Sequence, residues 1–574
     1  MAGIPAAQPL PEAFQKSFLE AATYPKNLVH RTVQTYPGAL HRIENRLDEA
    51  ADRLFEPDTG VLDVPFRDLQ LASGEELSKE NIESRMELEQ WLKVDLSIDQ
   101  TGGPLPVVVS TLAKDPKCRL IYVWADHSRA RLKISRKMLM LILTWHQVMP
   151  AYLDFMYVFG EQSDQPDLRF TGFREQTNLG LQFQRLAIPS LGRSGRQFQI
   201  CYNLKNVELK ARDDDNFVHD EWSIRQAAIH HQFDIEEGTT LWLLTKGSLD
   251  LHHRFKELTG KDARPEDKNF RTPEESFRAS LSAHLLWCYW STDDWRSYLR
   301  WLETAIQEES DLAVLGPRGA GHAHKYYRPQ DVQSLQIWEE KANTAIMVLE
   351  SNIDIMQSLT GFYKRLLANK EFDLGTLRSD DIDAFVAQIN DIIHDFRSQI
   401  GRATDLVKVT NNRRELIMQH LESQSAERME VLNRNLEKEA IVVRIITIVT
   451  LIYLPATFVS TFFSTDVIKY QGQDGGGNYS SIAMERWIEV TIPLTLLTLI
   501  FAWVSKSWAE KKRIQQEQPV QLQIRPQRIF QQAASQTPQQ VMIQVPSVPY
   551  HAKWRFPSRQ NTSQTVLPLH TLGP

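Results

Sequence analysis

Two apolar segments near the C-terminus constrain the fold of this chain more than any other feature. Residues 445–463 are 19 residues without a charge, and residues 490–504 are a second such run of 15. A helix of 19 residues rises roughly 28 Å, which is close to the ~30 Å hydrocarbon core of a bilayer. The two runs therefore predict two membrane-spanning helices, with two buried core helices as the alternative.

The charges around these runs predict the orientation of the chain. The connecting loop has Lys469 and Arg486 against three acidic residues, whereas both outer flanks are basic. By the positive-inside rule we expect an integral membrane protein with both termini cytosolic and the loop outside, in a membrane that the sequence does not identify. Asn478 in the loop begins a glycosylation sequon.

The rest of the composition narrows the classes of function. The formal net charge is −7, from 65 Lys+Arg and 72 Asp+Glu, so no basic excess favours a nucleic-acid partner. Three separated cysteines without a CxxC pair argue against a disulfide scaffold and fit a reducing compartment. The N-terminus lacks the pattern of a signal peptide. No nucleophile–base arrangement stands out, so we expect neither an enzyme nor a cofactor.

Two kinds of motif are weaker candidates for chemistry. Histidines lie close together at residues 230–231, 252–253 and 322–324, but a third ligand at zinc spacing is not evident, which favours structural roles. Residues 191–196 (Leu-Gly-Arg-Ser-Gly-Arg) suggest a phosphate loop. They contain neither GxGxxG nor a P-loop lysine, so a tight turn is favoured.

Strand patterns are confined to the first half of the chain. They occur at residues 120–125, 198–207 and 222–233, and residues 236–238 predict a hairpin turn into a strand at 239–245. These patterns predict a mixed α/β domain.

Helical patterns follow. Thr272 and Glu275 form a capping box, and Thr292 is expected to cap the next helix. Two long helices are expected, one at residues 329–369 and one from residue 380 onward, which can continue without a proline to Pro455. The Gln-, Pro- and Ser-rich tail from about residue 514 is expected to be disordered.

Together these patterns predict an α+β cytosolic domain, then long stalk helices, then two C-terminal transmembrane helices. The expected divisions are residues 1–117 (mixed helical and irregular), 118–271 (cytosolic α/β domain), 272–440 (helical and stalk region), 441–464 (first transmembrane helix), 465–486 (external loop), 487–505 (second transmembrane helix) and 506–574 (basic, disordered cytosolic tail).

Polar side chains gather on one face of the first predicted span, within roughly 60° of the direction of Thr457. Toward the cytosol the same face continues with the apolar Val443 and Ile446. A hydroxyl-lined face that narrows to an aliphatic ring describes a pore with a hydrophobic constriction. Hydroxyls bonded to their own helix or joining two helices are an equal alternative. The residues of this polar stripe are Thr450, Tyr453, Thr457, Ser460, Thr461 and Ser464.

Pro455 lies within this span, on the face away from the polar stripe. Proline removes one helical hydrogen bond, so the sequence predicts a kink there. Because a chain with two spans cannot enclose a channel, a pore would need a symmetric oligomer with this helix innermost.

The residues around Pro455 also carry a resemblance to a known family. Residues 450–463 read TLIYLPATFVSTFF, after a long helix and before a short loop, a second span and a basic exit. This arrangement resembles the CorA-like metal-ion transporters, most specifically in Leu-Pro-x-Thr-Phe-Val. Residues 143–150 (LTWHQVMP) resemble the cytosolic domain of eukaryotic CorA-like proteins. The resemblance to the core of the family covers about residues 400–513.

The resemblance implies a funnel of five subunits in the bilayer, whose first spans line a pore and whose cytosolic domains sense the ion. The family has Gly-Met-Asn at the pore mouth, where the asparagine holds a hydrated divalent cation; this chain has Ser464-Thr465-Asp466 there. Thr465 and Asp466 would then form the mouth, with Asp466 as the metal site, because oxygens can hold Mg²⁺ with its water shell. Thr457 matches a threonine that the family places along its pore.

We therefore expect a CorA-like transporter or channel for a divalent cation, with Mg²⁺ as one candidate ion. The alternative is a non-conducting, membrane-anchored CorA-like sensor or scaffold, which the loss of Gly-Met-Asn permits.

The predicted stalk has a thin apolar stripe, whose spacing of 4, 11 and 4 residues favours a straight or slightly right-handed bundle. Its acidic residues suggest a solvated face, with ion sensing between subunits as the sharper alternative. The stripe is Ile417, Leu421, Leu432 and Leu436, and the acidic residues are Glu415, Glu422, Glu427, Glu430, Glu437 and Glu439.

Overall fold

The computed structural model of the chain describes residues 7–32, 35–71, 74–98, 107–161, 167–210, 222–315, 326–374, 379–464 and 481–534. The chain forms two compact units, Met1–Glu427 and Arg428–Pro574. Three residues singled out from the sequence, Thr465, Asp466 and Asn478, lie outside the described residues, as do the histidines at 322 and 324.

A mixed β-sheet forms the centre of the first unit. Among the described residues it has seven strands, in the spatial order β3-β2-β6-β10-β9-β8-β7. Strands β6 and β10 are parallel, and the other neighbours are antiparallel. The strands are β2 (Val64–Leu69), β3 (Leu77–Ile82), β6 (Cys118–Trp124), β7 (Phe173–Asn178), β8 (Gln197–Leu209), β9 (Trp222–Asp234) and β10 (Thr240–Lys246).

The strands predicted at 120–125, 198–207, 222–233 and 239–245 are confirmed as β6, β8, β9 and β10. Strands β9 and β10 pair from Phe233↔Thr240 to Ala227↔Lys246, so the predicted hairpin is confirmed as well. Gly238 in its turn has φ +67°, and a Cβ there would lie 2.6 Å from the Cα of Pro273. Glycine is therefore needed both for the backbone conformation and for the close approach of the helix that begins at Pro273.

The main sheet contains strands from both sides of the expected domain boundary between residues 117 and 118. Strands β2 and β3 come from the N-terminal region, and β2 pairs with β6 from Phe66↔Ile121 to Leu69↔Cys118. Three more strands in this region form a small antiparallel sheet of order β1-β5-β4. Residues before 118 are thus part of the same α/β fold. The small sheet consists of β1 (Gln8–Pro9), β4 (Val94–Ile98) and β5 (Val107–Thr111).

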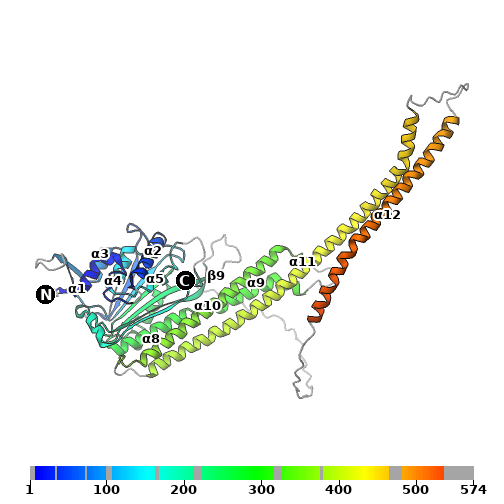
Figure 1. The fold of residues 1–574 in the computed structure, drawn as a ribbon. Coiled ribbons are helices and arrows are strands. Elements are labelled where there is room, and N and C mark those ends of the chain that lie inside the picture. The colour runs from blue at the N-terminus through cyan, green and yellow to red at the C-terminus, as the bar shows by residue number, and fades with distance from the viewer. Residues whose placement is uncertain are drawn as a thin grey trace, which may run out of the picture. The chain divides into compact units, whose positions relative to one another are not determined.

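Helices cover both faces of the main sheet (Figure 1). One hydrophobic cluster joins one face to α1–α5, with Trp145 and Tyr152 fully buried in it. The other joins the opposite face to α6 and α8–α11, with Trp242, Trp287 and Tyr363 fully buried. The N-terminal helices are α1 (Glu12–Leu19), α2 (Pro37–Leu54), α3 (Arg85–Trp91), α4 (Arg136–Trp145) and α5 (Tyr152–Met156). The later ones are α6 (Asp250–Leu258), α7 (Pro265–Lys268), α8 (Pro273–Trp290), α9 (Trp295–Leu315), α10 (Pro329–Leu367) and α11 (Ser379–Phe463).

Two predicted helix starts have different outcomes. The capping box of Thr272 and Glu275 is confirmed at the start of α8, with both reciprocal hydrogen bonds present. Thr292 does not cap α9: its hydroxyl donates to the carbonyl of Tyr289 at 2.7 Å. Asp294, with φ +60°, separates it from the helix, so the hydroxyl completes the end of α8 instead.

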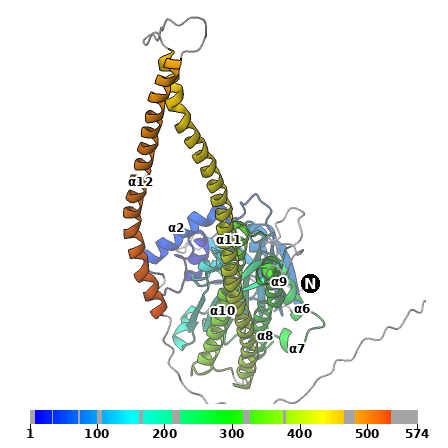
Figure 2. The ribbon, with the colours of Figure 1, turned by 90° about the vertical axis from the view of Figure 1, so that its right-hand side faces the viewer.

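Long helices dominate the rest of the chain. The first unit contains α8, α9, α10 and the beginning of α11, which lie together in Figure 2. Helix α11 includes Pro455 and continues to Phe463, so it contains the predicted first span. Helix α12 (Ser481–Ala534) extends beyond residue 514, where the sequence predicted disorder.

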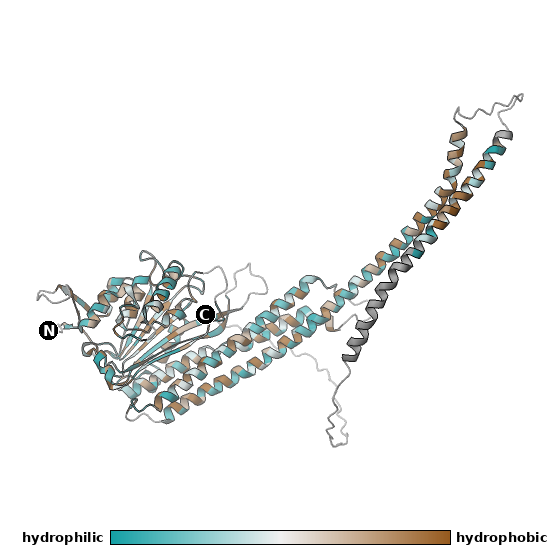
Figure 3. Ribbon diagram, in the orientation of Figure 1, coloured by the Kyte–Doolittle hydropathy of each residue, from teal (hydrophilic) through white to brown (hydrophobic). Residues whose placement is uncertain are grey.

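Both predicted spans lie in these two helices. Of the helices in the described parts of the chain, α11 and the α12 stretch Met484–Trp508 are long and apolar enough to cross a membrane. Only 6% of each apolar window is buried within the chain. Figure 3 shows the apolar residues concentrated where α11 ends and α12 begins. Two core helices of a soluble protein would be mostly buried, so the low burial favours the membrane alternative.

Candidate functional site

One side of the α11 span is covered by the second membrane helix. Pro455 and Val459 are buried, with Val459 only 3% exposed. On α12, Thr491 is buried, and the Trp487 indole N–H donates to the Ser460 hydroxyl at 3.0 Å. The helices thus meet through the side of α11 that carries Pro455.

The polar stripe lies mainly on the uncovered side of α11. Tyr453 is 66% exposed, and Thr457 and Thr461 are also exposed. Ser460 is exposed as well, but its bond from Trp487 places it at the border with α12. The stripe therefore does not join α11 to α12, apart from Ser460. Water, lipid or another copy of the chain remains to cover it.

Four of the six hydroxyls of the stripe, those of Thr450, Thr457, Thr461 and Ser464, are bonded to their own helix. Thr450 donates to the carbonyl of Ile446 at 2.8 Å, Thr461 to that of Thr457 at 2.7 Å, and Ser464 to that of Thr461 at 3.0 Å. A hydroxyl that donates in this way keeps its oxygen lone pairs for a second partner. Back-bonding therefore satisfies the hydroxyl proton and still leaves an oxygen surface that can accept from water or contact a cation.

The predicted metal ligand at the pore mouth is Asp466, which lies outside the described residues. Within the described parts of the chain, no group of three or more His, Cys, Asp or Glu side chains could hold a metal ion. His231 is fully buried; its Nε2 lies 2.9 Å from the Thr240 hydroxyl and its Nδ1 3.1 Å from Nε2 of His284. Burial lowers the pKa of His231, so it is a neutral core side chain whose ring nitrogens are both used.

The predicted stalk stripe is divided between two environments. Ile417 is fully buried, and Leu421 packs against the core of the first unit. Leu432 and Leu436, in the second unit, are each 52% exposed. The four residues thus do not form one interface, because the first two are used within the chain. The acidic residues named above are exposed, which fits a solvated face.

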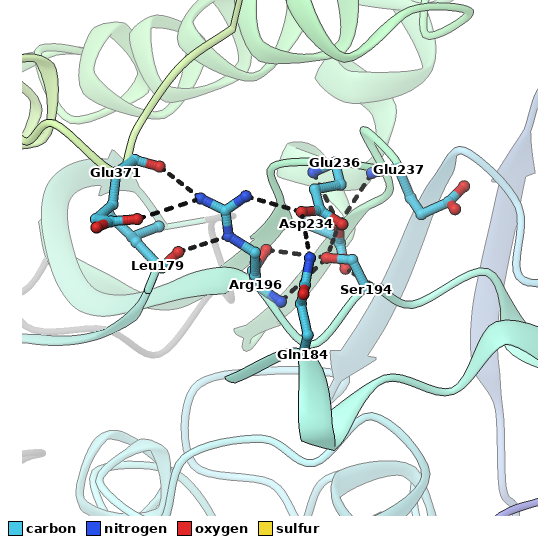
Figure 4. Close-up of polar contacts among 8 residues, drawn as sticks. All are labelled: Leu179, Gln184, Ser194, Arg196, Asp234, Glu236, Glu237 and Glu371. Carbon is cyan, nitrogen blue, oxygen red and sulfur yellow. Dashed lines mark hydrogen bonds and ion pairs between the residues drawn. The ribbon is translucent and has the colours of Figure 1, made fainter. Parts of the chain in front are cut away.

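Residues 191–196 form a tight turn, as predicted, and its hydrogen-bond donors face a carboxylate of the chain itself (Figure 4). Gly192 and Gly195 have φ of +70° and +80°. The Ser194 amide and hydroxyl each donate to Asp234 at 2.7 Å. The amides of Glu236 and Glu237 also donate to Asp234. This carboxylate occupies the place that a phosphate would need.

Arg196 extends the same network (Figure 4). Its guanidinium donates to the Leu179 carbonyl at 2.6 Å, to Glu236 at 2.8 Å and to the Glu371 carbonyl at 2.8 Å. Burial raises the pKa of Asp234, although the hydrogen bonds from Ser194 and the backbone oppose that shift. The turn is a structural joint between the sheet and the segment after α10.

Sequence reasoning missed two features of these sites. The contact between Trp487 and Ser460 joins residues 27 positions apart. Finding it from the sequence would have required knowing how α11 and α12 are rotated toward each other. The bidentate pair of Asp68 with Arg119, at 2.9 and 2.7 Å, joins β2 to β6. The short strand β2, Val-Pro-Phe-Arg-Asp-Leu, gives no signal in its sequence for such a buried pair.

Comparisons with known proteins identify a family and several similar solved structures. A sequence model of the family of CorA-like transporters matches residues 16–314, just over half of the chain and entirely before the membrane helices. Similar solved structures include a CorA magnesium transporter from Methanocaldococcus jannaschii (TM-score 0.33, 10% identity, 78% of this chain and 97% of that chain covered). Another is the full-length CmaX protein (TM-score 0.30, 11% identity, 77% and 99% covered). No curated protein matches the chain.

Proposed function

This chain belongs to the family of CorA-like transporters, and we propose from that premise that it conducts a divalent cation through a pore lined by α11. The family consists of transporters rather than enzymes, in line with the prediction from the sequence. The pore would be formed by the polar stripe of residues 450–464, and Mg²⁺ is one candidate ion.

The uncovered polar stripe is the observation that carries the proposal. Thr457 and Thr461 are exposed on a helix whose other side packs on α12. A row of oxygens at membrane depth is better accommodated by water than by hydrocarbon. An aqueous passage along this face would give the hydroxyl oxygens their second partner.

The same argument requires several copies of the chain. One α11 cannot surround a passage, so copies must gather around an axis with their stripes inward. We propose a homo-oligomer, with a pentamer as the stoichiometry that the family resemblance implies. Val443 (61% exposed) and Ile446 (59% exposed) continue the stripe toward the cytosol and would form the apolar constriction.

At the other end of the span, Thr465 and Asp466 would form the outer mouth. A ring of carboxylates there would concentrate cations, and it would hold a hydrated Mg²⁺ through its waters. The basic flanks of the two spans support cytosolic termini and an external mouth.

A second candidate is a membrane-anchored sensor or scaffold that does not conduct. The replacement of Gly-Met-Asn by Ser464-Thr465-Asp466 favours it, because the family's filter geometry is not reproduced. The two candidates differ in a single measurable quantity, the flux of divalent cation.

Uptake of Mg²⁺ by vesicles containing the full-length chain tests the proposal. We expect flux from the wild type, and a loss of at least roughly ten-fold in the Asp466→Ala, Thr457→Leu double variant, which corresponds to a rise of about 1.4 kcal/mol in the barrier to permeation. Thr498→Val is the matched control, because this α12 hydroxyl also bonds back to its own helix, at 2.8 Å from the Thr495 carbonyl. Equal flux from the wild type and the double variant would contradict a pore through α11, and no flux from the wild type would favour the sensor.

A further inference from the structure

A tyrosine lies at the middle of the first membrane span. Tyr453 is the ninth of the 19 uncharged residues 445–463, so its Cα is roughly 12 Å or more from either end of that run. Tyrosines of membrane helices gather at the interfaces, because the ring is apolar and the hydroxyl is hydrated. At the depth of Tyr453 the side chain is too short to place its hydroxyl at an interface. The hydroxyl therefore needs a polar partner inside the membrane.

The chain itself does not supply that partner. Within its described parts the Tyr453 hydroxyl makes no hydrogen bond, and the residue is 66% exposed. Thr450 and Thr457, one turn away on either side, donate to carbonyls of their own helix at 2.8 and 3.0 Å. The phenol hydroxyl stands at the end of a rigid ring and cannot bend back in this way. Its partner must come from outside the chain.

Tyr453 is also the largest side chain of the polar stripe. The other members of the stripe are threonine or serine, and its apolar continuation is Val443 and Ile446. The other side of α11 is covered by α12, where Pro455 and Val459 are buried. When several stripes face a common axis, the tyrosine rings narrow the passage more than any other residue of the stripe does, and water in the passage is the partner of their hydroxyls.

The proposed pore lacks the determinant of specificity that its family uses. At the mouth this chain has Ser464-Thr465-Asp466 in place of Gly-Met-Asn. A ring of carboxylates concentrates cations but does not limit their size. A ring of aromatic side chains does limit size, and the electron-rich faces of the rings attract cations.

We propose that Tyr453 sets the ion specificity of the pore proposed above, on which this inference rests. The rings of all copies form the narrowest point of the passage, at the middle of the membrane. The phenol oxygens there replace part of the outer water around a passing cation. The substrate class is then a small inorganic cation with a compact water shell, and bulky organic cations are excluded.

The size limit of the pore tests this role. Vesicles containing the full-length chain are given Mg²⁺, tetramethylammonium or tetraethylammonium, and uptake is measured. We expect the wild type to pass Mg²⁺ and to exclude both organic cations. Tyr453→Ala and Tyr453→Thr, which both remove the ring, are expected to raise tetramethylammonium uptake at least roughly ten-fold, a fall of about 1.4 kcal/mol in its barrier.

Two further variants separate the ring from the hydroxyl and from aromatic bulk in general. Tyr453→Phe keeps the ring, so we expect an unchanged size limit and, without the phenol oxygen, a roughly ten-fold lower Mg²⁺ flux. Phe458→Ala is the matched control, because Phe458 is an equally exposed aromatic residue of α11 (63%) that lies roughly 100° around the helix from Thr457, outside the stripe. It should keep the size limit and the Mg²⁺ flux of the wild type.

The role of the ring would be overturned by wild-type uptake of tetraethylammonium, by an unchanged size limit in Tyr453→Ala and Tyr453→Thr, or by the same increase in Phe458→Ala. Unchanged Mg²⁺ flux in Tyr453→Phe would overturn the role of the hydroxyl. In each of these cases Mg²⁺ flux from the wild type, and its loss in the Asp466→Ala, Thr457→Leu variant, would leave the proposed pore in place. Absence of wild-type flux would overturn the pore and this inference together.

Discussion

Two buried histidines make the folding stability of the first unit depend on pH. His230 and His284 are fully buried, and burial lowers the pKa of each to about 3. In the unfolded chain each would titrate near 6.5. The unfolded state therefore binds more protons below that value, and stability is lost as the pH falls from about 6.5 toward 3.

Replacement of His230 by leucine tests this dependence. Between pH 6.5 and 5, one such histidine removes about 2 kcal/mol of folding free energy. We expect His230→Leu to lose correspondingly less stability than the wild type over that range. The measurement is denaturant unfolding in detergent at several pH values, followed by tryptophan fluorescence.

His41→Leu is the control, because the His41 side chain is 71% exposed. It should keep the pH dependence of the wild type. A His230→Leu protein with an unchanged pH dependence would show that His230 is not held neutral by burial.

At the scale of elements, the pairing of β2 with β6 makes residues before 118 part of the main sheet. Asp68 of β2 and Arg119 of β6 are 2% and 5% exposed and form a bidentate pair. Without Asp68 the buried Arg119 keeps only Asp115, whose Oδ1 lies 3.5 Å from its Nη1, and loses both short hydrogen bonds of the bidentate pair. We expect Asp68→Ala to destabilise the first unit by about 3–5 kcal/mol, measured by denaturant unfolding.

The double variant Asp68→Leu, Arg119→Met should recover much of that loss, because it leaves neither charge buried. Asp58→Ala is the surface control: its pair with Lys137 is about half exposed, and its loss should cost less than about 1 kcal/mol. Equal effects of Asp68→Ala and Asp58→Ala would contradict the buried role of the Asp68 pair.

The sequence predicted those elements whose signals are local. The hairpin of β9 and β10 has a turn glycine between two apolar runs, and α8 begins with a complete capping box. Strand β2 was missed because it reads Val-Pro-Phe-Arg-Asp-Leu, in which proline and charges argue against a buried strand. Its charge pairs with a residue 51 positions away, and a sequence pattern contains no information on such a partner.

The sequence also predicted part of the candidate site, namely which residues of α11 share a face. Helical periodicity grouped the polar stripe and placed Pro455 on the other side, and α12 covers that other side. Periodicity could not separate Ile417 and Leu421, which pack within the chain, from the exposed Leu432 and Leu436. Whether the polar stripe lines a pore depends on how copies of the chain assemble, so this role stays a prediction.

At the scale of the whole molecule, exposed apolar residues before the span bear on assembly. Leu432 and Leu436 are one helical turn apart on α11 and are each 52% exposed. Association of copies would remove them from water, at about 25 cal/mol for each Å² buried. We expect Leu432→Asp, Leu436→Asp protein to shift toward smaller species in native mass spectrometry.

Asn433→Asp, Asn435→Asp protein is the matched control, since it gains the same charge on exposed positions and keeps both leucines. It should keep the wild-type stoichiometry. An unchanged oligomer in the leucine variant would exclude this stretch of α11 from the interface.

The central claim, that the polar stripe faces water, is tested most directly by cysteine accessibility along α11. The native cysteines, Cys118, Cys201 and Cys288, are all buried in the first unit, so the background reaction is low. Single cysteines at Thr457 and Thr461 sample the stripe. The side packed on α12 is sampled at Val459, and the exposed far side at Phe462 (47% exposed).

Each variant is treated in membranes with a water-soluble, positively charged methanethiosulfonate, and the rate of modification is measured. If the stripe lines an aqueous passage, the cysteines at 457 and 461 react at least roughly ten-fold faster than those at 459 and 462, because the reacting thiolate forms only in contact with water. Equally slow modification at all four positions would mean that lipid or protein covers the stripe, and ion conduction along α11 would be contradicted.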